Sequence, residues 1–278
     1  MYKKWPLFTP LLMKLIVSFY LCAASLNVSA LAPTPVILAE PSHKQYQQVL
    51  TLLRFKQFDQ AHKQMASLVD HPLYPYLVKE DIEQRITRYP YTDVEQFLDQ
   101  YGQTVAGRQL RHKWLSILAK SQRWDAYLKD YQNQSGNKKL TCWYLEALHQ
   151  TGFSQLALDK TADVWLYKDS LPSVCNPSFR RWNQAGLITD QLVWQRLNLA
   201  LNDKNMKLAS FLKRRASVDL SADARRLYKV HKNPKLLTNS HQHITGSERD
   251  AEIISHGLSR LAYKDAELTT TLWHNYQR

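Results

Sequence analysis

Short polar connectors recur between stretches with a helical hydrophobic period, and this repetition constrains the fold more than any other feature. Apolar residues such as Tyr46, Val49 and Leu53 recur at the spacing of one helix face. Five connectors place a polar turn before a small residue: 55–61, 121–126, 151–157, 202–209 and 262–266. Each is expected to join two antiparallel helices. Because such hairpins bury a continuous core only by stacking, the sequence predicts an all-α fold, an α-solenoid or superhelix of antiparallel, degenerate tetratricopeptide-like hairpins.

The scarcity of glycine supports a helical fold. Only 7 of 278 residues are glycine, whereas globular proteins average about 7 %, which argues against sandwiches, barrels and phosphate-cradling loops. Thr92 and Glu95 have the spacing of a capping box that opens a helix. The connector spacing is irregular, so a compact all-α bundle remains the alternative. We find no linker, and residues 43–278 are predicted to form one scaffold unit.

The first thirty residues have the pattern of a secretory signal peptide. A basic start is followed by a short apolar run and by small residues, which predicts a signal peptide over residues 1–30 with cleavage after Ala30 or Ala32. A transmembrane anchor is the alternative, but about ten apolar residues are too few to cross a bilayer. Residues 31–42 contain three prolines and are expected to be extended. We therefore expect a periplasmic protein with no membrane span after signal removal, and nucleic acid is not an expected partner.

Two cysteines remain after signal removal, Cys142 and Cys175. In an oxidising compartment such a pair most simply forms one disulfide. Two buried free thiols and a metal site are the alternatives. The pair His241 and His243, with His231 nearby, could in principle bind zinc. No third ligand has the right spacing to this pair, so neither a metal nor a cofactor is predicted. The motifs of common nucleophilic, nucleotide-binding and metalloprotease sites are absent from the sequence, and no catalytic residue is predicted.

Basic residues are concentrated between Asp203 and Lys235. Ten basic residues oppose three acidic ones there, in a chain whose formal net charge is +13. A solvated outer face is one interpretation, and an anion-binding surface is the other. The candidate residues for binding anions are Arg214, Arg215, Arg225, Arg226 and Lys229. Outside the cytoplasm, the available polyanions are peptidoglycan with its free carboxylates and anionic lipid or lipopolysaccharide.

Several segments together resemble the N-terminal part of the soluble lytic murein transglycosylases. They are His71–Leu77, Cys142–Tyr144, Thr151–Gly152, Asp163–Leu166, Cys175, Phe179–Trp182, Arg196–Leu201 and Asn233–Lys235. In that family, helical hairpins form a U-shaped superhelix that carries a lysozyme-like domain. That domain cleaves the MurNAc–GlcNAc bond of peptidoglycan and leaves a 1,6-anhydro sugar. The resemblance implies a superhelical scaffold here and a disulfide between Cys142 and Cys175.

The departures from the family pattern concern catalysis. The family's catalytic glutamate lies in a Glu-Ser motif, and none of the eight glutamates in this chain precedes a serine. No catalytic residue is carried over, and the chain is expected to stop before a catalytic domain, with an uncovered apolar end at Leu272, Trp273 and Tyr276. The main hypothesis is therefore the scaffold part of a transglycosylase whose partner is peptidoglycan. The alternative is a free-standing periplasmic adaptor that binds other cell-wall or envelope proteins.

Overall fold

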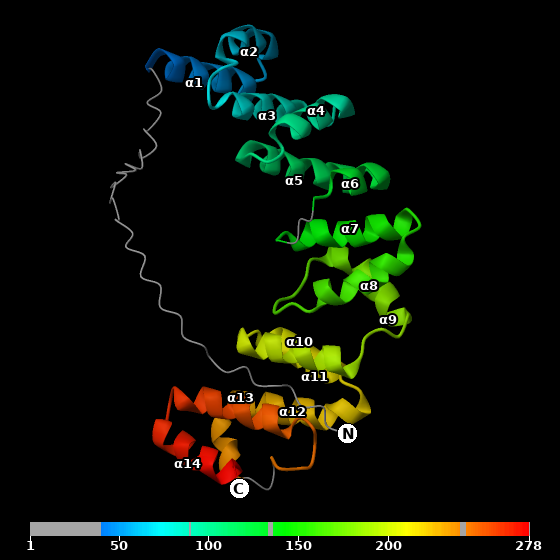
Figure 1. Ribbon diagram of the computed structural model, residues 1–278, viewed down its shortest axis with the longest axis vertical. Coiled ribbons are helices and arrows are strands. Elements are labelled where there is room, and N and C mark those ends of the chain that lie inside the picture. The colour runs from blue at the N-terminus through cyan, green and yellow to red at the C-terminus, as the bar shows by residue number, and fades with distance from the viewer. Residues whose placement is uncertain (1–39, 89, 133–135, 240–242, 278) are drawn as a thin grey trace, which may run out of the picture.

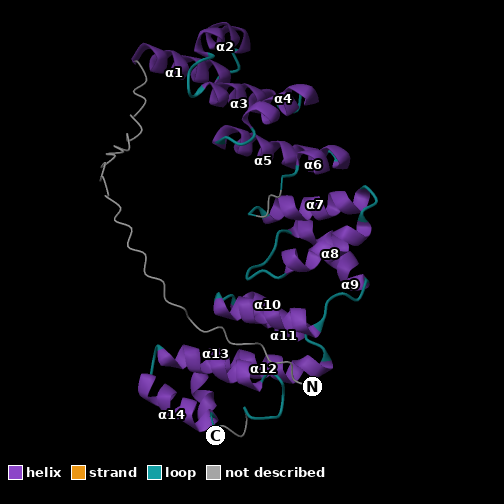
Figure 2. Cartoon of the chain, in the orientation of Figure 1, coloured by secondary structure: helices purple, strands orange, loops and turns teal. Residues whose placement is uncertain are grey.

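Helices follow one another along the whole described part of the chain. The structure is a computed structural model that describes residues 40–88, 90–132, 136–239 and 243–277. Its α-helices are α1 (Glu40–Arg54), α2 (Phe58–Met65), α3 (Tyr74–Arg85), α4 (Tyr91–Tyr101), α5 (Val105–Lys120), α6 (Trp124–Asp130), α7 (Lys138–Gln150), α8 (Ser154–Trp165), α9 (Asn176–Gln184), α10 (Asp190–Asn202), α11 (Met206–Arg215), α12 (Val218–Lys232), α13 (Asp250–Ala262) and α14 (Ala266–Tyr276). Short 3₁₀ helices are η1 (Ala66–Leu68), η2 (Ser173–Cys175) and η3 (Pro234–Thr238). Within these described ranges there is no strand (Figure 2), which confirms the predicted all-α class.

The helices are stacked in chain order along a curved array (Figure 1). Helix α1 lies at one end and α14 at the other, and each helix packs chiefly against helices close to it in the sequence. A compact bundle would instead bring distant helices together. The solenoid prediction is therefore confirmed, and the bundle alternative is wrong.

Four of the five predicted connectors have the same backbone conformation at the end of their first helix, and so does the connector between α9 and α10, at Gly186. Their central residues, Lys56, Gln122, Gly152 and Lys204, have φ between 56° and 92°. The next amide donates to a carbonyl of the last helical turn, as from Asn205 to Ala200 at 2.8 Å. A left-handed residue with this hydrogen bond defines a Schellman motif, which stops a helix and turns the chain back. The recurring connectors thus mark real hairpins, although three of the four left-handed positions hold Lys or Gln.

The core runs through the array as a chain of apolar clusters between adjacent helices. Trp182 and Trp194 are less than 2 % exposed, and Trp114, Trp143 and Trp165 are also buried. Buried leucines and alanines fill the remaining space between helices. These tryptophans pack in the core, where large aromatic rings contribute most to apolar burial.

Three local expectations were wrong. Helix α1 begins at Glu40, so residues 40–42 are helical and not extended, because proline is tolerated in a first helical turn. Residues 1–39, with the predicted signal peptide, lie outside the described part.

Helix α4 begins directly after Pro90, which places Thr92 inside the helix, where it makes no cap. Leu272 is buried, and the Tyr276 hydroxyl donates to the carbonyl of Leu237 at 2.7 Å, so only Trp273 of the predicted apolar end is exposed.

Candidate functional site

The predicted basic residues lie on α11 and α12 but do not share one environment. Arg214, Arg215, Arg225 and Lys229 are exposed. Arg214 and Arg225 each donate to a serine of their own helix, Ser210 and Ser221, which leaves the guanidinium groups at the surface. The structure therefore places four of the five predicted cations at the surface. We call Arg214, Arg215, Arg225 and Lys229 the basic face.

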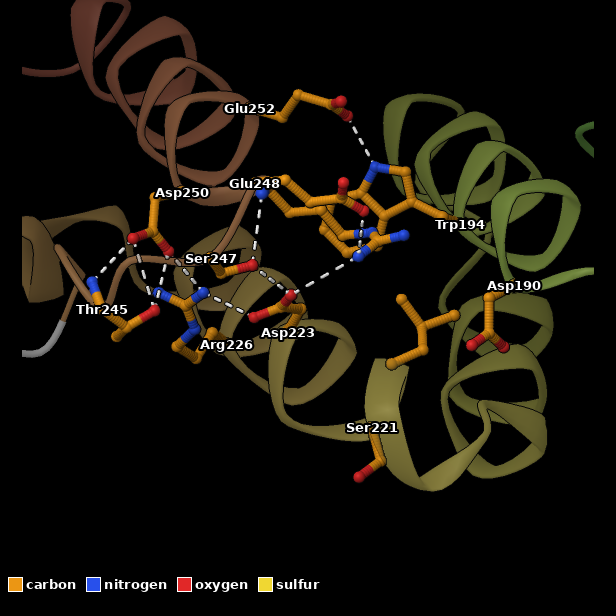
Figure 3. Close-up of polar contacts among 12 residues, drawn as sticks. Asp190, Trp194, Ser221, Asp223, Arg226, Thr245, Ser247, Glu248, Asp250 and Glu252 are labelled. Carbon is orange, nitrogen blue, oxygen red and sulfur yellow. Dashed lines mark hydrogen bonds and ion pairs between the residues drawn. The ribbon is translucent and has the colours of Figure 1, made fainter.

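Arg226, the fifth predicted cation, points into the molecule. Its guanidinium donates to Asp223 at 2.5 Å and to Asp250 at 2.6 Å, and bridges α12 to α13 (Figure 3). Asp250 also accepts from the amides of Thr245 and Gly246. Although burial disfavours the Asp250 charge, the bonds from Arg226 and Thr245 outweigh it and hold the pKa of this carboxyl below its ordinary value. The charge of Arg226 is thus compensated internally.

Further hydrogen bonds around Arg226 connect helices α10, α12 and α13. The Trp194 indole donates to Glu252 at 2.6 Å, which ties α10 to α13, and Ser247 donates to Asp223 (Figure 3). We call the cluster around Arg226, Asp223, Asp250 and the Trp194–Glu252 pair the ion-pair joint. Its carboxylates are engaged by neighbouring donors, so the cluster has the character of a stabilising network and not of an acid–base site.

A second joint connects α7 to the segment that begins α9. Cys142 on α7 and Cys175 in η2 form the predicted disulfide, with their Cα atoms 4.9 Å apart. Arg181 on α9 donates to both carboxylate oxygens of Glu146 at 2.9 and 2.8 Å. Burial opposes the Glu146 charge, but the bonds from Arg181 outweigh it and lower the pKa of the carboxyl. We call this pair of bridges the disulfide joint; it contradicts both free thiols and a metal at the two cysteines.

The histidines considered for zinc are not brought together as a metal site. His231 forms a 3.0 Å hydrogen bond between its Nδ1 and Nε2 of His256, a partner on α13 that the spacing analysis missed. His243 is buried elsewhere, beside Arg226, and His241 lies outside the described residues. Among the residues that the structure describes, no group of three or more His, Cys, Asp or Glu side chains could hold a metal ion.

Asp130 is the described carboxyl that most resembles a general acid. Burial raises its pKa, as is common for catalytic acids. However, its Oδ2 accepts from the Trp114 indole at 2.8 Å and from the Tyr91 hydroxyl at 3.3 Å. The adjoining cavity is about 160 Å³, well below the roughly 300 Å³ at which ligand pockets begin. Asp130 therefore anchors α6 to α4 and α5.

A larger groove follows α7, and the sequence did not indicate it. Its volume is about 690 Å³, and its lining includes Tyr131, Lys138, Tyr144, Leu148, Phe153 and Leu156. The lining residues come from the end of α6 and the residue after it, from α7, from the connector after α7 and from α8. We call it the α7 groove. In the part of the chain that is described, no helix is long and apolar enough to cross a membrane.

One family profile matches part of the chain. A profile described as cucumovirus coat protein matches residues 146–232. The match covers less than half of the chain, and it begins inside α7, so it cuts through one hairpin of a continuous array. It therefore does not establish a family.

Curated relatives match most of the chain. The soluble lytic murein transglycosylase of Escherichia coli K12 is 24 % identical over 242 residues, which is 87 % of this chain and 37 % of that protein. The soluble lytic murein transglycosylase of Salmonella typhimurium LT2 is 27 % identical over 173 residues, or 62 % of this chain and 27 % of that protein. This chain thus spans 37 % of the first of these relatives and 27 % of the second.

Solved structures give the same result for the fold. An inactive mutant of the lytic transglycosylase Slt from Pseudomonas aeruginosa has a TM-score of 0.72 at 27 % identity, over 84 % of this chain and 38 % of that one. The 70-kDa soluble lytic transglycosylase of E. coli has a TM-score of 0.67 at 23 % identity, over the same shares. The curved array and the sequence matches agree: the chain is a homologue of the soluble lytic murein transglycosylases and has the fold of their N-terminal superhelical domain.

Proposed function

We propose that this chain is the superhelical scaffold portion of a periplasmic soluble lytic murein transglycosylase. The observation that carries the proposal is the structural match over 84 % of the chain to a lytic transglycosylase. In the family, the activity is cleavage of peptidoglycan with formation of 1,6-anhydro-MurNAc during cell wall turnover. The predicted signal peptide supports a periplasmic location. A free-standing adaptor is not favoured, because the relatives that match 87 % and 62 % of this chain are both named soluble lytic murein transglycosylases.

The scaffold is proposed to lack cleavage activity within these residues. General acid catalysis needs a carboxyl within reach of the leaving-group oxygen in a sugar-sized cleft. Two glutamates of the array are instead engaged in structural contacts, Glu146 with Arg181 and Glu252 with Trp194.

The basic face gives the scaffold a surface suited to anionic peptidoglycan. Arg214, Arg215, Arg225 and Lys229 are exposed on two adjacent helices. Their attraction for carboxylates acts through water and is screened over about 10 Å at 0.1 M salt. We therefore expect weak, salt-sensitive binding that holds the scaffold near the cell wall.

The experiment is sedimentation of the purified chain, without its signal peptide, with isolated sacculi at low and raised salt. We expect weak binding that falls several-fold when Arg214→Glu, Arg215→Glu, Arg225→Glu and Lys229→Glu are combined. Arg226 is left unchanged because reversing it would disrupt the ion-pair joint. The matched control combines Lys44→Glu, Arg54→Glu, Lys63→Glu and Lys120→Glu, four exposed cations on α1, α2 and α5.

Two outcomes separate the parts of the proposal. Release of anhydro-muropeptides by this chain alone would contradict the scaffold function, because a catalytic group would then have to be present. Equal binding by both quadruple variants would leave the scaffold standing and show that the basic face is only a solvated surface.

A further inference from the structure

The α7 groove combines an apolar floor and rim with a cationic end. Leu145 and Leu148 of α7 form the buried floor, and Phe153 and Leu156 form a rim at the connector end. Phe153 is 56 % exposed and Leu156 is 41 % exposed, so the rim places large apolar surface in water. At about 690 Å³, the groove lies in the range of ligand-binding sites.

The repeated connectors show that the fold does not require this apolar rim. Phe153 is the residue after the left-handed position of its connector. The equivalent residues in the other described connectors of this kind are Gln57, Arg123, Asn205 and, after Gly186, Leu187. All five connectors form the same helix-ending hydrogen bond. Three of them hold a polar residue at this position, so the turn itself does not require the exposed phenylalanine.

The floor of the groove is held in place before anything binds. Leu145 and Val164, which line the groove, pack in one cluster with the buried cysteines Cys142 and Cys175. A disulfide directly beneath the floor limits how far α7 can shift. Pre-organisation of this kind reduces the entropy lost on binding.

The aromatic side chains favour apolar side chains over sugars as occupants. Tyr131 and Tyr144 stack on one another with their ring centroids 4.3 Å apart and their planes 11° apart. Each ring therefore covers one face of the other, which reduces the aromatic surface that is open to a sugar ring. The exposed Phe153 and Leu156 instead fit branched apolar side chains.

Charge distinguishes the two ends of the groove. Because α7 and α8 are antiparallel, Lys138 at the start of α7 and Lys160 in the second half of α8 lie away from the connector. Asp163 is the acidic residue of the lining, so two cations oppose one anion. Lys138 sits over the ring of Tyr167 at 4.7 Å, which orients its ammonium group.

We propose that the α7 groove docks an extended segment of a partner protein that carries apolar side chains next to a carboxylate. The apolar side chains lie against Leu148, Phe153 and Leu156, and the carboxylate faces Lys138 and Lys160. The site is separate from the basic face on α11 and α12, so it goes beyond the proposed binding to peptidoglycan. It gives the scaffold a means of recruiting a second protein.

The test uses the intact chain without its signal peptide and two biotinylated hexapeptide libraries. Both are amidated at the C-terminus and carry Leu, Ile, Val or Phe at positions 2 and 5; one ends in Glu and the other in Lys. We expect the Glu library to bind at least tenfold more tightly at 50 mM salt. Phe153→Ser with Leu156→Ser should reduce that binding at least tenfold, whereas Phe55→Ser, an exposed aromatic in another connector, should not. Lys138→Glu with Lys160→Glu should reverse the preference to the Lys library.

Each remaining result overturns the proposal. Absence of binding by both libraries at 1 mM total peptide would contradict a docking groove. Binding that survives Phe153→Ser with Leu156→Ser would place the peptides elsewhere on the molecule.

A purified disaccharide tetrapeptide from peptidoglycan serves as a third probe. If it binds more tightly than the Glu library and is displaced by the rim substitutions, the occupant is the murein strand and not a protein. Because none of these readouts involves sacculi or α11 and α12, they can fail independently of the proposed function.

Discussion

The disulfide joint and the ion-pair joint perform the same task with different chemistry. At the first, a covalent bond between Cys142 and Cys175 holds α7 to the start of α9. At the second, Arg226 joins Asp223 and Asp250 and so holds α12 to α13. A curved array has few contacts between distant helices, so each joint depends on its local bridges. We therefore expect reductant to lower the stability of the first joint. The stability of the second should fall when one charge is removed or when the pH is lowered.

Between the two joints, a buried cation connects helix α10 to a loop without a disulfide or an ion pair. Arg196 on α10 donates to the carbonyls of Tyr167 and Asp169 and stacks on Trp165 at 4.5 Å. Burial lowers the pKa of its guanidinium to about 10. Here a buried cation is satisfied by carbonyl dipoles and an aromatic ring, which ties the loop after α8 to α10.

Removing the disulfide should have the largest effect on stability. The bridge closes a loop with a sequence separation of 33 residues, so Cys142→Ala with Cys175→Ala should lower the free energy of unfolding by about 3–4 kcal/mol on the chain-entropy account. Urea denaturation followed by circular dichroism measures the change. Reductant should destabilise the natural chain and leave the double variant unaffected. If reductant shifts both equally, the disulfide is not what secures this joint.

Removing Arg226 should have the next largest effect. Arg226→Met leaves Asp223 and Asp250 without their shared counter-charge in a mostly buried site, which should cost about 2–3 kcal/mol. Arg225→Met changes the neighbouring exposed residue and should cost less than about 0.5 kcal/mol. Urea titration of the two variants measures the difference. Adding Asp223→Asn and Asp250→Asn to Arg226→Met should restore part of the loss; a further loss of similar size would show that the charges are not coupled.

Acid should weaken the helix pair of the ion-pair joint first. Burial, with Arg260 nearby, lowers the pKa of both His231 and His256 from 6.5 to about 4. Between these values the unfolded chain binds more protons than the folded chain, so stability should fall as pH drops from 6.5 to 4. His256→Gln should flatten this dependence, whereas His274→Gln, at an exposed site, should not. Thermal unfolding across this pH range measures how stability depends on pH. If stability changes equally with pH in both variants, the dependence does not come from His231 and His256.

The sequence predicted what depends on local periodicity, and missed what depends on contacts across helices. Helix faces, buried tryptophans and the hairpin connectors follow from spacing within one stretch. Arg225 and Arg226 are indistinguishable in sequence, and only the position of α13 separates an exposed cation from a bridging one. The His231–His256 contact and the α7 groove likewise arise from packing between elements, which spacing along one helix does not encode.

The smallest predicted effect concerns the connectors beside the two joints, where one backbone conformation is occupied by different residues. Gly152 ends α7 with φ +92° and Lys204 ends α10 with φ +61°. A residue with a side chain is strained by about 1–2 kcal/mol in the left-handed region, and glycine avoids this strain. Glycine also gives the unfolded chain more conformational freedom, which offsets part of the gain in stability. Lys204→Gly should therefore raise the free energy of unfolding by about 0.5–1 kcal/mol. Gly152→Ala should lower it by about 1 kcal/mol; a Cβ at Gly152 meets no atom within 4 Å, so conformation and not crowding sets that loss. Urea denaturation of the two variants tests this directly, and a stabilising Gly152→Ala would show that the residue is not held in the left-handed region.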